Sequence, residues 1–515
     1  MAYIGNSPEK GNFRKCDAIT TSATATYNLL VGGVAVNPNQ NQCIVSLNGV
    51  IQSSGNSYTI ASSQITFAST LASSDVIDFI LILGDTLDVG VPSDDTVDAS
   101  KITANVITGQ TALGATPADT DELLISDAGT LKRVDYSHLK SSVVNRPNAQ
   151  ALIINGSMAV AQRGTSTTGV TNGGSGYITC DRMRFNESGT MGAALTITQE
   201  SLTSGNAFIN GFANAFKVDV TTADSSPDAD DWSRINMRLE SQDLQVFKKG
   251  TSNAEKFTLA FWVKATKTGT NTIELYDADN TRCIGGSYSI SSSNTWEHKV
   301  VNFAADTTGA FADDNGEGLR ISWTLSAGSN YSSGTLPTAW GSCTSANTAA
   351  GQVNHFDSTS NNFHITGVQL EVGEYTSATL PPFQFESFAD NLRRCHRYTY
   401  VMGSADNAEN GGQFTIGSGM CRSSGSAIFT DIVGSYPQPL RTLPSVTQVG
   451  GDMADLFCYK TNGTSADPSS IAIGRNTIAL KLANNMGTSS GLNAGDATVQ
   501  QIVEADTKLV FSAEL

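Results

Sequence analysis

The feature that most constrains the fold is a strict alternation of apolar and polar residues in the middle of the chain. The segments KFTLAFWVKA (Lys256–Ala265) and LRISWTL (Leu319–Leu325) both follow it. A period of two residues places successive side chains on opposite faces of a β-strand, so one face of each segment can enter a core. Segments of the same kind lie at Ile153–Val160, Leu195–Glu200, Ala215–Val220, Ile235–Leu239, Thr272–Tyr276, Trp296–Phe303 and Phe363–Val372. Together they predict a sandwich of two sheets.

The composition favours an all-β fold. Charged residues make up 15% of the 515 residues, against roughly 25% in typical soluble proteins. Gly alone contributes 48 residues, and Gly, Ser, Thr and Asn favour turns over helix interiors. At about 100–200 residues per domain, the length predicts about three domains, each able to bury a core.

Charge and hydropathy argue against two kinds of partner. The net charge is −17, and Lys and Arg form no cluster, so a nucleic-acid partner is not expected. No apolar run approaches the ~18 residues that a membrane span needs. Residues Met1–Gly11 carry no basic segment followed by an apolar one. We therefore expect neither membrane insertion nor export through a cleaved signal.

Cysteine usage points to a reducing site of assembly. Eight cysteines are scattered along the chain: Cys16, Cys43, Cys180, Cys283, Cys343, Cys395, Cys421 and Cys458. They form no C-x-x-C motif and no His lies at metal-ligand spacing, so a zinc site is not expected. Free Cys is among the most buried residue types, and we expect mostly buried thiols in a chain assembled in a cytosol.

Three further patterns precede the sandwich region. Short alternating runs between Val45 and Leu83 predict a compact β-domain of antiparallel strands. The segment Gly84–Ser100 then holds five Asp residues and no Lys or Arg, which favours an extended tether. Leu123–Ile125 and Leu131–Val134 next predict a β-hairpin, and a short helical turn follows it.

Three stretches resemble bacteriophage tail fibres and receptor-binding proteins. The first is similar to the amino-terminal attachment module of marine podovirus-like phages, through Val45, Asn48–Val50, Gln52, Tyr58, Ile60, Ile65–Phe67, Asp75 and Leu83–Gly84. The second, through Ile154–Ser157, Val160 and Gln162–Gly164, resembles the jelly roll of carbohydrate-binding modules in such fibres. The third resembles the point where that jelly roll closes and a distal domain opens, through Gly367–Gly373, Pro382–Phe383 and Ser387–Tyr398.

The resemblance implies an organisation, a location and a set of partners. We predict a tail-attachment β-domain at residues 1–84, an acidic linker with a trimerisation element at 85–147, a carbohydrate-binding-like jelly roll at 148–385 and a distal β-domain at 386–515. A tail fibre is a homotrimer of the virion, assembled in the bacterial cytoplasm. Its amino terminus binds tail adaptor or nozzle proteins, and its distal domains bind host surface glycan or lipopolysaccharide during adsorption.

Aromatic residues of the jelly roll supply candidates for glycan contact, because an aromatic face can stack on the C–H face of a sugar ring. A long Gly/Ser/Thr/Asn-rich loop, Ser326–Thr359, has the length of a functional loop. The candidates are Trp340, Tyr331, His355 and Asp357 in that loop, and Trp262, which opposes the apolar face of its strand. Trp323 alternates with Ile321 and Leu325, so we expect it in the core.

The sequence gives little support to catalysis. The G-x-S-x-G match at Gly487–Gly491 lacks a preceding strand and a following helix. We therefore predict a binding protein without enzyme activity. The alternatives are a structural virion adaptor or decoration protein, and an envelope-polysaccharide depolymerase, which needs two nearby carboxylates.

No cofactor is predicted, with structural calcium as an alternative. The candidate ligands are Asp277, Asp279, Asp313, Asp314 and Glu317. These acids fall in turns where Asp is expected for backbone reasons alone.

Overall fold

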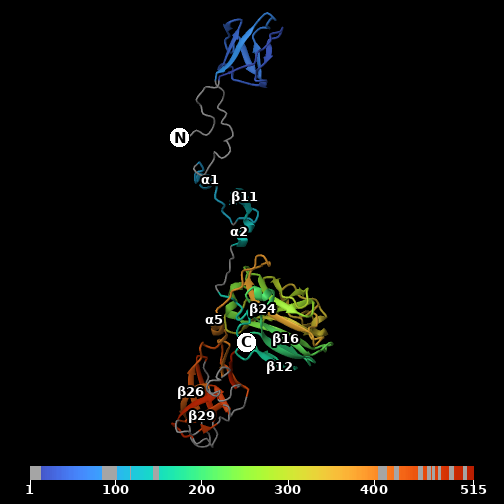
Figure 1. The fold of residues 1–515 in the computed structure, drawn as a ribbon, viewed down its shortest axis with the longest axis vertical. Coiled ribbons are helices and arrows are strands. Elements are labelled where there is room, and N and C mark those ends of the chain that lie inside the picture. Colours follow the sequence, from blue (N-terminus) through green and yellow to red (C-terminus); the bar gives the residue numbers. More distant parts are fainter. Residues whose placement is uncertain are drawn as a thin grey trace. The chain divides into compact units, whose positions relative to one another are not determined.

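The computed structural model is all-β, as predicted (Figure 1). It describes residues 13–83, 101–115, 117–142, 150–403, 414–422, 429–450, 456–460, 465–466, 470–473, 477–485, 492–502 and 507–515. Contacts divide the chain into two compact units, Met1–Pro117 and Ala118–Leu515. The predicted tether Gly84–Ser100 and the motif Gly487–Gly491 lie outside the described residues.

Helices are short within the described ranges. The α-helices are α1 (Asn105–Thr108), α2 (Tyr136–Ser142), α3 (Gly205–Ile209), α4 (Ser329–Ser332) and α5 (Phe388–Cys395), and the 3-10 helices are η1 (Gln40–Gln42), η2 (Ser241–Phe247) and η3 (Ser345–Asn347). None of the described helices is long and apolar enough to cross a membrane.

The amino-terminal unit packs three small antiparallel sheets around one core. Their strand orders are β1-β9-β5-β6, β2-β8-β7 and β3-β4. The strands are β1 (Phe13–Lys15), β2 (Thr26–Asn28), β3 (Leu30–Val31), β4 (Val34–Ala35), β5 (Cys43–Leu47), β6 (Val50–Ile51), β7 (Tyr58–Ala61), β8 (Gln64–Phe67) and β9 (Ile77–Leu83). Val45, Tyr58 and Ile65 are buried in this core, on the faces that the alternation predicts.

The predicted hairpin forms from β10 (Glu122–Asp127) and β11 (Thr130–Asp135). Ala128 and Gly129 connect the strands with positive φ angles of 50° and 83°, which match the twist of a two-residue hairpin turn. Leu124 and Leu131 are 73% and 70% exposed. The hairpin therefore carries large apolar side chains that remain at its surface.

Residues from Ser166 to Val372 build a sandwich of two antiparallel sheets around the largest core. Sheet I has the order β12-β15-β16-β24-β18-β21, and sheet II has the order β13-β14-β17-β22-β19-β20-β23. Sheet I comprises β12 (Ser166–Val170), β15 (Ala194–Ser201), β16 (Asn214–Thr222), β18 (Phe257–Ala265), β21 (Glu297–Phe303) and β24 (Asn362–Val372). Sheet II comprises β13 (Gly176–Tyr177), β14 (Arg184–Ser188), β17 (Trp232–Glu240), β19 (Gly269–Asp277), β20 (Arg282–Ile290), β22 (Glu317–Ala327) and β23 (Gly341–Ser342). Trp323 is fully buried between the sheets, which confirms its predicted place in the core.

A β-bulge changes the faces of β24. Strict alternation predicts Phe363 and Ile365 on the face opposite Val368, yet all three enter the same core. The register against β18 shifts between Ala260 and Trp262, where Gly367 takes a φ of 62°. The bulge inserts one extra residue and so reverses the phase of the strand after Ile365. The predicted apolar face of Val368, Leu370 and Val372 thus enters the core, whereas the expectation that Phe363 and Ile365 lie on the opposite face is wrong.

The segment Ile153–Val160 is not a strand, although its alternation predicts one. It forms turns, and Asn155 and Met158 have positive φ angles of 58° and 56°. The Asn155 amide donates to Val160 O at 2.9 Å and to Asp181 O at 2.8 Å, while its Oδ1 accepts from Val160 N. This local hydrogen bonding competes with a strand ladder.

The distal part of the chain forms two antiparallel sheets with their own core. Their strand orders are β25-β34-β28 and β30-β29-β33-β26-β27-β32-β31. The strands are β25 (Thr399–Gly403), β26 (Phe414–Cys421), β27 (Phe429–Ser435), β28 (Ser445–Val449), β29 (Leu456–Lys460), β30 (Ser465–Ala466), β31 (Ser470–Ile473), β32 (Ala479–Asn485), β33 (Ala497–Ile502) and β34 (Lys508–Ser512). Leu482, Ile502 and Phe511 are fully buried there.

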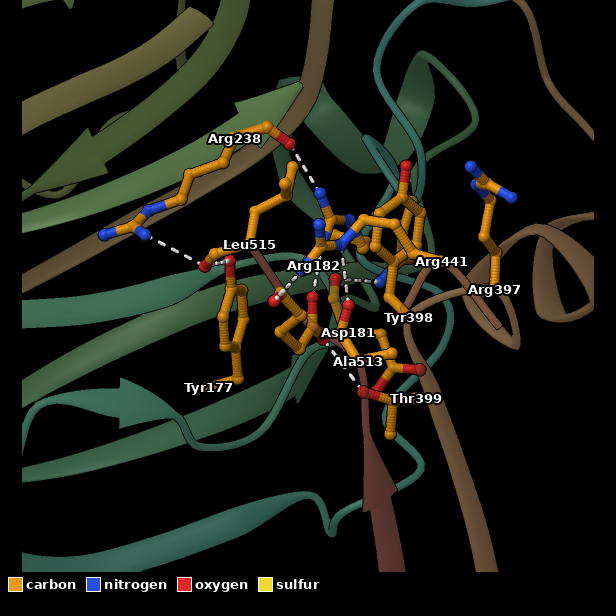
Figure 2. A network of polar contacts seen from close by, with 12 residues as sticks. Tyr177, Asp181, Arg182, Arg238, Arg397, Tyr398, Thr399, Arg441, Ala513 and Leu515 are labelled. Carbon is orange, nitrogen blue, oxygen red and sulfur yellow. Dashed lines mark hydrogen bonds and ion pairs between the residues drawn. The ribbon is translucent and has the colours of Figure 1, made fainter. Parts of the chain in front are cut away.

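A network of buried charges joins this distal part to the sandwich (Figure 2). Glu514 follows β34 and accepts a hydrogen bond from Arg163 Nη2 at 3.0 Å, and it also pairs with Arg182. Thr399 Oγ1 donates to the same carboxylate at 2.9 Å. The Glu514 and Arg182 side chains are 6% and 4% exposed. The carboxylate thus pairs with two sandwich guanidinium groups that are buried with it, and Asp181 supplies a second negative charge 3.7 Å from Arg163.

A second carboxylate, from the sandwich, completes this junction. Glu240 at the end of β17 accepts from Arg397 Nε and Nη2, both at 2.6 Å, and from the Tyr398 hydroxyl at 2.5 Å. The Arg182 guanidinium lies 3.5 Å from the centre of the Tyr398 ring. The distal part therefore contributes Glu514 to arginines of the sandwich, and the sandwich contributes Glu240 to Arg397 and Tyr398 of the distal part.

Asp181 in this network gives a testable pH dependence. Burial raises the pKa of Asp181 to about 6, although Arg163 opposes the shift. The folded chain therefore holds a proton between pH ~4 and ~6 that the unfolded chain, with an Asp pKa of ~3.9, has lost. The stability gained from this proton is present below pH ~4 and disappears as the pH rises towards ~6.

We expect Asp181→Asn to remove this contribution. In denaturant unfolding between pH 4 and 7, the free energy of unfolding of the wild type minus that of the variant should fall up to about pH 6 and stay constant above it. A difference that rises over the same interval would contradict the raised pKa.

Candidate functional site

The two outer faces of the sandwich have different chemistry. On sheet I, Trp296 and Phe212 form a satellite apolar cluster with Leu202, and Trp262 and Phe383 pack against it. The Phe212 and Phe383 ring centres are 4.9 Å apart. This outer face is therefore covered in part by apolar segments of the same chain.

The outer face of sheet II is polar instead. Because Ile235, Met237, Ile321 and Trp323 point inward, the residues between them point outward. Three rows of outward residues cross the sheet: Asn186, Arg234 and Thr324; Arg184, Asn236, Ser322 and Glu274; and Arg238, Arg320 and Tyr276. The strand register thus places hydroxyl, amide, carboxylate and guanidinium groups on one surface.

Buried polar atoms without a partner lie at the centre of this face. Asn236, Ser322 and Thr324 are each 1% exposed. Neither amide atom of Asn236 has a hydrogen-bond partner among the described residues, and the same holds for Ser322 Oγ and Thr324 Oγ1. A buried polar atom without a partner costs about 1–3 kcal/mol. The three side chains lie side by side beneath the outer surface of sheet II, and a water molecule or a polar group that reached them would satisfy these atoms.

An ion pair and an aromatic pair flank these residues. Arg234 Nη1 donates to Glu274 Oε2 at 2.8 Å, and Arg234 Nη2 donates to Thr348 Oγ1 at 2.8 Å. The same guanidinium lies 4.7 Å from the centre of the Trp232 ring. The ring of Tyr331 meets the Trp232 ring edge to face, with centres 6.3 Å apart. The pair presents aromatic surface beside charged hydrogen-bonding groups.

The long loop after β22 lies against the same sheet. Gly285 N on β20 donates to Pro337 O at 2.7 Å, and a Cβ at Gly285 would lie 2.7 Å from Leu336 Cδ1. Thr348, which directly follows η3, reaches Arg234. The predicted functional loop therefore borders the polar face, and glycine at position 285 permits its close approach.

The structure separates the five predicted glycan-contact residues. Tyr331 borders the polar face of sheet II, whereas Trp262 lies on the outer face of sheet I with its ring centre 5.0 Å from that of His298. The Trp340 indole donates to Ala304 O at 2.7 Å and lies 5.7 Å from the Phe257 ring, packed against the core. Its stacking faces are thus partly occupied by the protein.

His355 and Asp357 have partners within the fold. His355 is 1% exposed and contacts Asn271 Oδ1 through Nε2 at 2.6 Å. Burial lowers the pKa of His355 to about 4, so the imidazole is neutral at pH 7. Asp357 pairs with Lys267 and accepts from Asn361 Nδ2 at 2.6 Å. Their predicted contact with glycan stays a prediction.

Most of the predicted calcium ligands accept hydrogen bonds from protein donors. Asp277 pairs with Lys249, Asp279 accepts from Ser241 Oγ at 2.9 Å, Asp314 accepts from Gly316 N at 2.8 Å and Glu317 pairs with Arg320 at 2.6 Å; Asp313 is exposed. Across the part of the chain that the structure describes, no three His, Cys, Asp or Glu side chains are grouped to hold a metal ion.

Sequence reasoning missed Asn236, Ser322, Thr324 and Glu274. The signal was present in the outward positions of the alternating strands, which read Arg234-x-Asn236-x-Arg238 on β17 and Arg320-x-Ser322-x-Thr324 on β22. Alternation identifies such residues as outward but does not align one strand with its neighbour. The register that brings them together is visible only in the sheet.

Comparisons with known proteins give only distant similarities. No family model matches the chain, and no curated protein matches it. Among solved structures, the chain is similar to the enzymatically active domain of bacteriophage CBA120 tailspike protein 4, with 13% identity, 43% of this chain and 21% of that chain covered, and a TM-score of 0.23. A family 16 carbohydrate-binding module gives 14% identity, 35% and 86% coverage, and a TM-score of 0.18.

An enzyme of unrelated name matches equally well. A Stig cyclase from Fischerella shares 12% identity over 44% of this chain and 100% of its own, with a TM-score of 0.25. These values assign neither a family nor a ligand to the chain. What the structure defines is an all-β protein whose sandwich has a polar outer face.

Proposed function

We propose that the chain binds glycan through the outer face of sheet II. The observation that carries the proposal is the row of buried polar atoms without partners on Asn236, Ser322 and Thr324. A sugar hydroxyl both donates and accepts, so it can pair with an amide and a hydroxyl at once. Glu274 and Arg234 supply charged partners, which form stronger hydrogen bonds with neutral groups.

Aromatic rings next to these groups support the same ligand class. Trp232 and Tyr331 lie beside Arg234, and the half-buried Tyr276 ring lies 5.2 Å from the Arg320 guanidinium. An aromatic face covers the C–H face of a sugar while hydroxyl groups at the ring edge reach the polar row. A saccharide therefore uses both parts of the surface.

The proposed context of this binding is a phage tail fibre. The amino-terminal β-domain fixes the chain to the tail, and the sandwich and distal domain meet the bacterial surface without cleaving it. Weak contacts to single sugars become effective when several chains engage one cell. The resemblance in the sequence supports this context.

Thr324→Val tests the glycan site. The change removes one hydroxyl and keeps the shape, so affinity for the glycan identified on an array should fall about tenfold. The temperature of unfolding should stay the same or rise, because the wild-type hydroxyl lacks a partner. Isothermal titration and thermal unfolding measure the two effects.

Thr198→Val is the matched control, since Thr198 is a half-buried outward residue on sheet I. It should bind glycan as the wild type does. Equal affinity of the Thr324→Val variant and the wild type would reject the site, and an array without any bound glycan would reject the function. Release of reducing sugar from host polysaccharide would show a depolymerase instead.

We further propose that the β10–β11 hairpin joins three copies of the chain. A two-stranded hairpin alone is at best marginally stable in water. Leu124 and Leu131 lie on one face, while the partly exposed Leu123 and Ile125 lie on the other. Apolar residues on both faces of so small an element find a core between copies.

Leu124→Asp combined with Leu131→Asp is expected to convert the trimer to monomers, because each interface would bury unpaired charges. Light scattering coupled to size-exclusion chromatography gives the mass. Thr111→Asp with Ala112→Asp adds equal charge at exposed positions outside the hairpin and should leave the trimer intact. A wild-type chain that is monomeric would contradict the proposal.

A further inference from the structure

Two cysteines meet at the edge of sheet II where the long loop begins to cross it. Cys283 lies on β20 and is 2% exposed, whereas Cys343 directly follows β23 and is exposed. The edge strand β23 pairs with β20 so that Gly341 is opposite Cys283. Alternation then places Cys343 on the same face as Cys283, as its diagonal neighbour.

The strand register therefore places the two thiols side by side. Their interaction, helped by the main-chain N–H of Thr344, lowers the pKa of Cys283, and the same interaction raises the pKa of Cys343. A sulfur that is stabilised as a thiolate beside a second thiol is arranged for thiol–disulfide exchange.

The surroundings allow the two sulfur atoms to come closer. Diagonal neighbours across a ladder are farther apart than a disulfide prefers, so one of them has to move slightly. β23 is two residues long and lies at the edge of sheet II. Cys343 can therefore shift without breaking hydrogen bonds of a central strand. Among the seven cysteines that the structure describes, it is the exposed one, which makes it accessible to an oxidant.

We propose that Cys283 and Cys343 form a disulfide when the protein passes from a reducing to an oxidising environment. A small-molecule disulfide such as oxidised glutathione is the oxidant. The accessible Cys343 thiol loses its proton to solvent as its sulfur attacks the oxidant, forms a mixed disulfide and releases one glutathione thiolate. The Cys283 thiolate then attacks Cys343 Sγ, forms the S–S bond and releases the second glutathione thiolate. Both released thiolates take up the two protons lost by the cysteines, so two protein thiols are oxidised and one disulfide is reduced.

The bond would tie the long loop to sheet II beside the polar face. The same loop carries Tyr331 and Thr348, which contact Trp232 and Arg234. A covalent link at Cys343 closes the segment Cys283–Cys343 into a loop and reduces the freedom of the unfolded chain. It therefore stabilises the sandwich whether or not that face binds glycan.

The experiment incubates the full chain with oxidised glutathione, blocks free thiols and maps the peptides by mass spectrometry. We expect a peptide pair linked through Cys283 and Cys343, and a rise of about 5 °C in the temperature of unfolding of the sandwich. Reduction with dithiothreitol should reverse both.

Three variants distinguish an internal Cys283–Cys343 disulfide from glutathione that stays attached to Cys343. Cys283→Ser should leave glutathione attached to Cys343, and Cys343→Ser should prevent the temperature shift. Cys43→Ser, at a buried thiol of the amino-terminal unit, should preserve the link. Wild-type chain that keeps glutathione on Cys343 without forming the internal bond, or that links Cys343 to another cysteine, would overturn the proposal.

Discussion

Lys249→Met is expected to lower the free energy of unfolding of the sandwich by about 3–5 kcal/mol. The Lys249 side chain is fully buried, and its ammonium group lies 2.5 Å from Asp277 Oδ2 and 3.0 Å from Asp306 Oδ2. It also donates to Thr308 O at 3.0 Å and Gly309 O at 2.7 Å. Methionine fills the volume but leaves a buried carboxylate and two carbonyl groups without their cation. Urea unfolding, followed by the fluorescence of the sandwich tryptophans, measures the loss.

The neighbouring lysine supplies the control. Lys248 pairs with Glu255 at 2.7 Å, but the two side chains are 54% and 38% exposed. Exposed pairs contribute about 0–1 kcal/mol, so Lys248→Met should change stability little. Adding Asp277→Asn to Lys249→Met should recover part of the loss, because it removes the uncompensated charge. Equal effects of Lys248→Met and Lys249→Met would reject the role of the buried ammonium.

Glu514→Gln is expected to destabilise the junction between the sandwich and the distal domain by about 3 kcal/mol. The variant keeps the size of the side chain but leaves Arg182 and Arg163, which are 4% and 11% exposed, without the carboxylate that pairs with both. Burial opposes ionisation of Glu514, but Arg182 and Arg163 outweigh it and lower its pKa. The carboxylate is therefore charged at pH 7, and its contribution disappears only as the pH falls through this lowered pKa.

Hydrogen exchange measures this loss of stability at the junction. Amides of β25 and β34 should exchange faster in the Glu514→Gln variant than in the wild type. Glu374→Gln is the control, since Glu374 forms a surface pair with Lys256 and is 55% exposed. Unchanged protection of β25 in the Glu514→Gln variant would mean that the junction does not depend on this charge.

The sequence predicted the strands of the sandwich well because each carries its own periodic signal. Phe257–Ala265 alternates over its full length, and its apolar residues fill the core as expected. Two features of the sandwich region were not predicted, and each has a local cause. The bulge at Gly367 shifts the phase of β24, and the Asn155 side chain turns Ile153–Val160 away from a ladder. A glycine inside an apolar strand is a hint of a bulge, but its position depends on the partner strand.

The candidate site was predicted only in part. The long loop and Tyr331 were identified from composition and length, and both border the polar face of sheet II. Asn236 and Ser322 are 86 positions apart in the sequence, and each alone is an ordinary outward residue of a strand. Their pairing depends on which strands are neighbours and in what register, and this information is distributed over the whole sheet. The junction residues Glu240 and Glu514 were missed for the same reason.

The return of β34 to the side of β25 has a mechanical consequence. Thr399 and Ser512 are paired at the place where the chain leaves the sandwich, so the described distal strands enter and leave at one point. For the ligand proposed on sheet II, tension between that ligand and the chain that enters the sandwich is carried by the sandwich and not by the distal strands. Because its first and last strands are paired with each other, the distal domain can stay folded while the sandwich carries the load.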